Sequence, residues 1–233
     1  MHTVIGFYDY TLILTLLGLV SSVFGMIQAA NGHIRLALLC LIVSGICDGF
    51  DGMVARTKKN RTTDEKSFGI QLDSLCDMVA FGAFPAMLCY HLGVRGPLGI
   101  LAISLYCVCS VIRLSYYNVK ELNRLFSEQP GDKYYYGLPI TSITVILPVF
   151  FSLRLVLSER AFAVVLSVLL IVVAICFILN FRMRSPKKLL PLAIPALAIF
   201  LFCEVFFLSR SGEAPMTLGE AWKTMLDTFR AIG

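Results

Sequence analysis

Four aspartates in the first third of the chain have the clearest chemical potential. Asp48 and Asp51 lie in one long hydrophobic segment, and Asp73 and Asp77 lie in the next. An ionised carboxylate near the centre of a bilayer costs about 2.5–3.5 kcal/mol on insertion scales. No lysine or arginine is interleaved among them in these segments except Arg56, at the end of the first one. A bound divalent cation is the natural compensator, which makes this a candidate metal site.

The spacing of the acids predicts that each pair shares one helix face. Residues three or four apart are neighbours on a helix, so Asp48 pairs with Asp51 and Asp73 with Asp77. Because a short connection makes the two helices antiparallel neighbours, packing these faces inward brings four carboxylates together. Small residues on the same helices let a ligand or another helix approach the backbone closely. These residues are Gly52, Ala55 and Gly69.

This set of ligands indicates phosphoryl-transfer chemistry. Oxygen ligands without His or Cys favour Mg²⁺, Mn²⁺ or Ca²⁺ over Zn²⁺. Four carboxylates suffice for two metals with shared ligands, and a two-metal site stabilises both the attacking and the leaving oxygen. The adjacent basic loop suits a nucleotide diphosphate that arrives from the cytoplasm. The alternative is that the acids only pair with Arg56 and the loop lysines, but burying four acids without a function is expensive.

The composition predicts an integral membrane protein. Of 233 residues, 58% are hydrophobic and 15% are charged, whereas a soluble domain is roughly 25% charged; the mean hydropathy is +0.80. A span needs about 20 apolar residues, so we expect an all-α polytopic membrane helix bundle of about 6–7 transmembrane helices. These use most of the chain and leave residues 1–233 as a single domain. The expected spans are 8–30, 33–56, 69–93, 96–119, 138–157, 160–181 and 187–208.

Positive charge is unevenly divided between the loops. Loops within 56–66, 120–133 and 182–188 hold twelve Lys and Arg residues, against four in the opposite loops before the tail. Basic loops stay in the cytoplasm, so the active site is expected to face the cytoplasm of a bacterial-type cytoplasmic membrane. The net charge of +5 reflects this asymmetry and not nucleic-acid binding. A capping-box pattern before an apolar stripe predicts an interfacial helix over 217–230, with a frayed tail as the alternative.

The acids belong to a longer pattern, D-x2-D-G-x2-A-R followed by a spacer and G-x3-D-x3-D. All eight fixed letters are present between Asp48 and Asp77. At these residues the chain resembles the CDP-alcohol phosphatidyltransferase family. One departure is the spacer, because the twelve residues between Arg56 and Gly69 are more than the family usually has. The insertion is polar, and we expect it in the loop at the cytoplasmic mouth.

The resemblance implies a lipid-linked donor, CDP-diacylglycerol, with surrounding membrane lipids and a homodimer. It also implies two divalent cations, Mg²⁺ or Mn²⁺. Their ligands would be Asp48, Asp51, Asp73 and Asp77. Asp77 resembles the family's general base. The nucleotide site would be lined by Gly52, Ala55, Arg56 and Gly69.

Within the family, the chain is most similar to the phosphatidylserine synthases, over 71–86, 112–118 and 136–139. This implies transfer of the phosphatidyl group from CDP-diacylglycerol to the hydroxyl of L-serine, with release of CMP and formation of phosphatidylserine. Serine is a zwitterion whose carboxylate suits a bidentate arginine. The expected acceptor contacts are Arg113, Asn118 and Lys133. A snorkelling side chain is the alternative account of the arginine.

Two other functions fit parts of the pattern. One is the same enzyme class with a different acceptor, such as inositol phosphate or glycerol phosphate. The other is a divalent-cation transporter that uses the same acids. A transporter needs polar groups along a continuous path across the bilayer, whereas the acids here are confined to one pair of neighbouring segments. The enzyme is therefore the favoured prediction.

Overall fold

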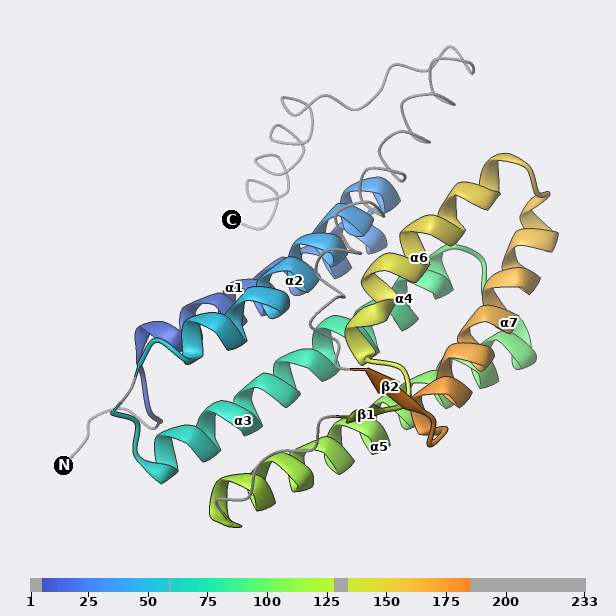
Figure 1. Cartoon of the computed structure of the whole chain (residues 1–233). Helices are drawn as coiled ribbons and strands as arrows, with labels where there is room; N and C mark the ends of the chain where they lie inside the picture. The colour runs from blue at the N-terminus through green and yellow to red at the C-terminus, as the bar shows by residue number, and fades with distance from the viewer. Residues whose placement is uncertain (1–5, 59, 128–133, 185–233) are drawn as a thin grey trace.

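The computed structural model describes residues 6–58, 60–127 and 134–184, and these form a helical bundle (Figure 1). Within the described residues, five helices are long and apolar enough to cross a membrane, and a sixth apolar helix, Ile140–Arg154, is shorter. The five are Tyr10–Ala30, Ile34–Ala55, Thr63–His91, Gly96–Phe126 and Glu159–Ile178. The predicted all-α polytopic bundle is thus confirmed. The expected span 187–208 and the interfacial helix 217–230 lie outside the described residues.

The first two long helices form an antiparallel hairpin. A short 3-10 turn, η1 (Tyr10–Leu12), leads into α1 (Ile13–Ala30), and α2 (Ile34–Ala55) follows after a turn at Gly32, whose φ is +84°. Hydroxyls join the two helices in the interior. The Oγ atoms of Ser22 and Ser44 lie 2.8 Å apart, and Ser44 Oγ donates to the Gly18 carbonyl at 2.9 Å. Small and hydroxyl residues of this kind hold membrane helices close together.

The third helix is continuous but irregular. It comprises α3 (Thr63–Asp77), a π-helical turn η2 (Met78–Ala83) and α4 (Phe84–His91). It begins at Thr63 and not at the expected residue 69, because Thr62 and Glu65 form a capping box: Glu65 N–H donates to Thr62 Oγ1 at 3.2 Å, and Thr62 N–H donates to Glu65 Oε2 at 3.0 Å. Half of the polar insertion is therefore helical, where a loop was expected.

The remaining described helices are α5 (Gly96–Ser127), α6 (Ile143–Phe151) and α7 (Glu159–Ile178). Short 3-10 turns flank α6: η3 (Ile140–Ser142) and η4 (Ser152–Leu155). Helix α5 continues eight residues past the expected end at 119. Two three-residue strands, β1 (Tyr134–Tyr136) and β2 (Arg182–Arg184), pair antiparallel. This small ladder, which the sequence pattern did not indicate, ties the segment before α6 to the segment after α7.

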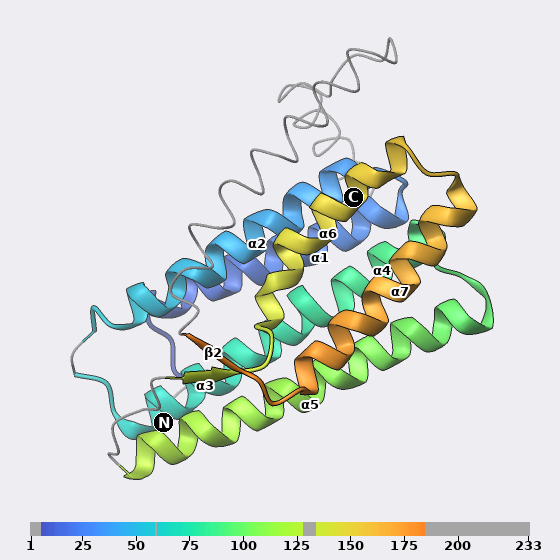
Figure 2. The same ribbon diagram turned by 45° about the vertical axis from the view of Figure 1, so that its right-hand side comes forward.

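The helices pack in an order that places the third helix at the centre. It lies between the α1–α2 hairpin and α5, while α7 packs on α5 and α6 lies beside α2 (Figure 2). Large apolar side chains are exposed on the outer faces of α1, α5 and α7, as lipid contact requires. The bulkiest buried side chains fill the interior between these helices and include Phe81, Phe84, Tyr106 and Phe162.

Gly25 generates a prediction about packing. It lies where α1 meets α2 and α4, and a Cβ there would lie 2.8 Å from Cys40 Cβ and against the Phe84 ring. We predict that Gly25→Ala lowers the melting temperature in detergent. Overpacking costs about 1–3 kcal/mol, against a gain of about 0.5–1 kcal/mol from alanine's helix propensity. Gly52→Ala is the matched control, because its Cβ would meet nothing within 4 Å. Equal melting temperatures for the two variants would contradict this close approach.

Candidate functional site

Three of the four predicted acids meet between α2 and α3. One carboxylate oxygen from each of Asp48, Asp73 and Asp77 lies within 4.8 Å of the other two. Asp48 lies near the C-terminal end of α2, while Asp73 and Asp77 are one turn apart on α3. The half-buried cluster arises from helical periodicity on two antiparallel helices, as the spacing predicted.

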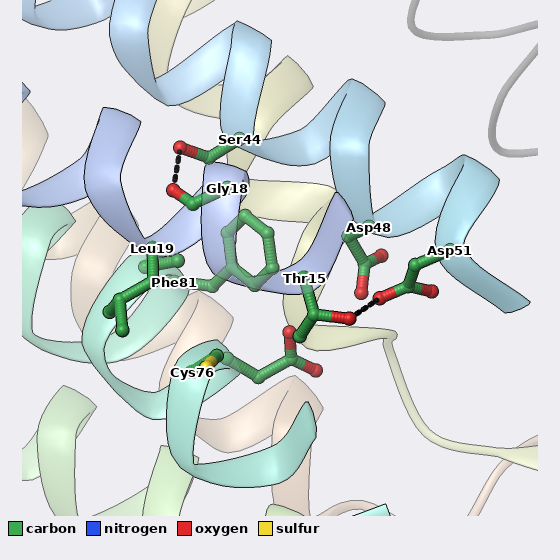
Figure 3. A pocket seen from close by; sticks show the side chains of 10 residues that line it. Thr15, Gly18, Leu19, Ser44, Asp48, Asp51, Cys76 and Phe81 are labelled. Carbon is green, nitrogen blue, oxygen red and sulfur yellow. Dashed lines mark hydrogen bonds between the residues drawn. The ribbon is translucent and has the colours of Figure 1, made fainter. Parts of the chain in front are cut away.

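The fourth acid, Asp51, lies one turn further along α2. It lines the same pocket as Asp48 and Asp77, and Thr15 Oγ1 on α1 donates to Asp51 Oδ2 at 3.0 Å (Figure 3). Apolar side chains, among them Leu19, Ala80 and Phe81, complete the lining. The pocket thus brings α1, α2 and the third helix together around the acids. Sequence reasoning missed Thr15, because a single threonine in an apolar run gives no signal of its own.

The donor set fits a divalent cation. Asp73 Oδ1 is buried and has no hydrogen-bond partner among the described residues, and a buried oxygen of this kind is costly unless a partner is bound. In the described part of the chain, the ion pairs of Lys and Arg involve other acids and none of the four in this site. Oxygen-only ligands with uncompensated negative charge suit Mg²⁺ or Mn²⁺. The acidic cluster could therefore hold metal.

The residues predicted to line the nucleotide site lie at the same end of the bundle as the acids. Gly52 and Arg56 are exposed, and Ala55 is half-buried on the last turn of α2. Space next to Gly52 is open, whereas a Cβ on Gly69 would lie 3.2 Å from Arg61 Nη2. Neither glycine has a side chain to cover its backbone. The backbone of Gly52 therefore faces open space, and the backbone of Gly69 faces the Arg61 side chain.

A cluster of ion pairs fixes this loop to the N-terminal segment. Lys58 Nζ lies 3.0 Å from Asp9 Oδ2 and 3.4 Å from Glu65 Oε1, and Arg61 Nη2 lies 3.7 Å from Asp9 Oδ2. Burial would raise the pKa of Asp9, but hydrogen bonds from Thr11 and Lys58 outweigh it and lower that pKa to about 2. The Asp9 carboxylate therefore stays ionised at any pH well above 2, and its ion pairs with Lys58 and Arg61 persist over that range.

Apolar and hydroxyl contacts reinforce the same attachment. The rings of Phe7 and Phe68 pack edge to face with centroids 5.7 Å apart. The Tyr10 hydroxyl lies 2.9 Å from Thr57 Oγ1. The sequence pattern placed the longer spacer at the mouth of the site but did not indicate its partners. These two contacts join residues 47 and 61 positions apart, and local periodicity does not indicate pairs at such separations.

The predicted acceptor residues have different surroundings. Asn118 on α5 accepts a hydrogen bond from Ser74 Oγ at 2.8 Å and donates to Gln71 Oε1 at 3.3 Å. These α3 residues flank Asp73 in sequence, so Asn118 lies beside the helix that carries the acids. Lys133 lies outside the described residues.

Arg113 is buried on α5, with 5% of its surface exposed. Its Nη1 donates to the carbonyls of Tyr136 and Phe177 at 3.2 and 3.3 Å. The guanidinium carbon also lies 4.8 Å from the centroid of the Tyr117 ring. Arg113 thus joins α5 to β1 and to the end of α7, while Asn118 joins α5 to α3.

Several curated proteins that resemble this chain are named as enzymes that synthesise serine lipids. The chain is 31% identical over 140 residues to the archaetidylserine synthase of Methanothermobacter thermautotrophicus, covering 60% of this chain and 56% of the relative. It is 33% identical over 134 residues to the CDP-diacylglycerol–serine O-phosphatidyltransferase of Helicobacter pylori, covering 54% and 52%. The enzyme of the same name from Bacillus subtilis is 37% identical over 91 residues, covering 38% and 49%.

These matches span about half the length of the curated relatives. A family model described as CDP-alcohol phosphatidyltransferase matches residues 11–180 of this chain. The matched range contains the acid cluster, the predicted nucleotide residues and, apart from Tyr10, every long helix that the structure describes. The chain belongs to the CDP-alcohol phosphatidyltransferase family.

Proposed function

We propose that this protein transfers the phosphatidyl group of CDP-diacylglycerol to the hydroxyl of L-serine, releasing CMP and forming phosphatidylserine. The observation that carries the proposal is the meeting of Asp48, Asp73 and Asp77 within 4.8 Å on the two helices that bear the family's motif. Serine as the acceptor is supported by the names of the related enzymes, which include both phosphatidylserine and archaetidylserine synthases. These names share the headgroup and differ in the lipid.

Two divalent cations, Mg²⁺ or Mn²⁺, would be held by the four aspartates. When bound, the cations supply charge neutralisation of the pyrophosphate and of the attacking and leaving oxygens. Asp73 would contribute its buried and otherwise unpartnered Oδ1. Thr15 would orient Asp51 by its hydrogen bond to Oδ2.

Asp77 would act as general base. Its carboxylate would take the proton from the serine hydroxyl as that oxygen bonds to the phosphorus bearing diacylglycerol, and the phosphorus–oxygen bond to CMP breaks. A carboxylate is a weak base for an alcohol, so the proton moves as the new bond forms and not before it. Positioning and charge stabilisation would supply most of the catalysis, as in other phosphoryl transfers.

Around this centre, the ends of α2 and α3 would bind the nucleotide. Gly52 and Gly69 would let the nucleotide approach backbone, and Ala55 and Arg56 would complete its site. Acceptor binding by Arg113, Asn118 and Lys133 stays a prediction, with Asn118 best supported because it contacts α3 on both sides of Asp73.

The surroundings of the site are proposed on the same basis. The basic residues at the ends of α2 and α3 would lie on the cytoplasmic side, near anionic lipid headgroups. The acyl chains of the donor would remain in the bilayer, against the apolar outer faces of the bundle. A homodimer and one domain over 1–233 also stay predictions.

The acceptor assay is the test of this proposal. Purified protein with CDP-diacylglycerol and Mg²⁺ or Mn²⁺ should release CMP with L-serine, and much less with inositol phosphate, glycerol phosphate or no acceptor. Chelation should abolish release, because the carboxylates would then repel the donor's pyrophosphate. Release with a different acceptor would keep the enzyme class and reject serine. Folded protein that releases no CMP with any acceptor, but moves divalent cations across vesicle membranes, would favour the transporter.

Asp77→Asn should reduce turnover by roughly 10²–10⁴-fold, the usual contribution of general acid–base catalysis. CDP binding should persist, because the other three carboxylates remain. The matched control is Asp64→Asn, because Asp64 is an exposed acid on the first turn of the same helix. This variant should keep the turnover of the unaltered protein. Turnover near that of the unaltered protein in Asp77→Asn would show that another group accepts the proton.

Thr15→Val keeps the shape of the side chain but removes the hydrogen bond to Asp51. Losing a partner that orients a metal ligand typically costs 10–100-fold, so we expect Mn²⁺ affinity to fall roughly 10-fold. Ser21→Ala is the control, because Ser21 Oγ on the same helix donates to the Cys40 carbonyl. Mn²⁺ titration followed by electron paramagnetic resonance measures both. If the two variants bind Mn²⁺ equally well, Thr15 does not orient Asp51.

A further inference from the structure

A π-helical turn interrupts the third helix directly after Asp77. It covers Met78–Ala83, and at its end Phe84 N–H donates to the Val79 carbonyl five residues earlier. Such turns are rare and occur mostly as single interruptions, frequently at functional sites. Here the turn begins at the residue that follows one of the clustered acids, so the backbone of Asp77 is shared between a regular and a widened turn.

Pro85 gives the irregularity a physical cause. Proline lacks an N–H, and its ring clashes with the carbonyl four residues earlier in a regular α-helix. That carbonyl belongs to Phe81, which therefore loses the donor that a regular helix would supply. Phe81 is buried, with 1% of its surface exposed, so water cannot replace this donor. A buried carbonyl requires a partner from elsewhere in the bundle.

Tyr106 supplies that partner from α5. Its hydroxyl donates to the Phe81 carbonyl at 2.5 Å, and its side chain is fully buried. The ring packs beside Phe177, with centroids 5.6 Å apart, which holds the hydroxyl in place. A buried tyrosine normally directs its hydroxyl to a partner. The link therefore joins α5 to the widened turn, one helical turn beyond Asp77.

The same turn forms part of the pocket. Phe81 lines it together with Asp48, Asp51 and Asp77 (Figure 3). A shift of the Phe81 backbone would move both this side chain and the adjoining end of α3, where Asp77 must stay within 4.8 Å of Asp48 and Asp73. Because a metal site tolerates little change in the spacing of its ligands, the hydroxyl of Tyr106 can influence metal binding without contact with the metal.

We propose that Tyr106 is a positioning residue for the metal site, acting through the Phe81 carbonyl to fix the π-helical turn that follows Asp77. The inference rests on the proposed function only in taking the acid cluster as the metal site. It does not depend on the acceptor or on the identity of the base. The competing account is that Tyr106 and the turn merely fill the interior around Pro85.

Tyr106→Phe separates the two accounts, because it keeps the ring and removes the hydroxyl. We expect Mn²⁺ affinity to fall roughly 10-fold, as for loss of other groups that orient metal ligands, with helical content unchanged. Tyr90→Phe is the matched control: it is the same substitution at a tyrosine that is 43% exposed on α4, and it should bind Mn²⁺ normally. A lower melting temperature with unchanged Mn²⁺ affinity would overturn the positioning role.

Pro85→Ala tests the route through the Phe81 carbonyl. An alanine at 85 has the N–H that proline lacks and can donate it to the Phe81 carbonyl. In the Pro85→Ala background, Tyr106→Phe should therefore lower Mn²⁺ affinity by less than about 3-fold. Such non-additivity is expected of coupled sites. The same roughly 10-fold loss in both backgrounds would overturn the proposed route. If the unaltered protein binds no Mn²⁺, the acid cluster is not a metal site and the proposed function is contradicted. If the unaltered protein and Tyr106→Phe both bind Mn²⁺ normally, only the positioning role of Tyr106 is contradicted.

Discussion

Repulsion among carboxylates that lie close together is the main constraint on the end of the bundle that carries Asp48, Asp73 and Asp77. Two unit charges 4 Å apart interact by about 4 kcal/mol at an effective dielectric constant of 20. Asp48, Asp73 and Asp77 lie at comparable separations, and the described residues place no cation against them. Protons or a divalent cation must therefore neutralise them. The packed helices hold the acids close together. A bound cation relieves their repulsion, and this relief favours its binding.

Helix α1 contributes no acid to the cluster, yet it determines how α2 presents its own. The hydroxyls of Ser22 and Ser44 and the carbonyl of Gly18 hold the two helices at short range. Thr15, one turn before Gly18, then reaches Asp51. The contacts that stabilise the hairpin and the hydrogen bond to Asp51 lie along one face of α1. Stability and site geometry are thus coupled in this hairpin.

Sequence periodicity predicted the helices and the shared faces of the acids, because both follow from the geometry of a single helix. It was less accurate where other rules competed. The start of the third helix was expected at 69, since the apolar run begins there, but the capping box of Thr62 and Glu65 extends it into polar sequence. The pairing of Asp9 with Lys58 and of Tyr106 with Phe81 depends on tertiary packing, and no pattern in the neighbouring residues indicates either partner. An uninterrupted span over 69–93 was likewise expected, although proline disrupts a regular helix, and the residue type of Pro85 does not indicate which side chain donates to the Phe81 carbonyl.

The early start of α3 also bears on the depth of the site. Asp48 lies seven residues before the end of α2, or about 10 Å at 1.5 Å per residue, while Asp73 lies ten residues after the start of α3, or about 15 Å. Since their carboxylates meet, α3 begins about 5 Å farther out than α2 ends. Its charged first turn, with Asp64 and Glu65, therefore projects beyond the end of α2. In the proposed reaction, the donor's acyl chains would stay in the bilayer, and its pyrophosphate and the acceptor would reach the acids from the end of the bundle where α2 ends and α3 begins.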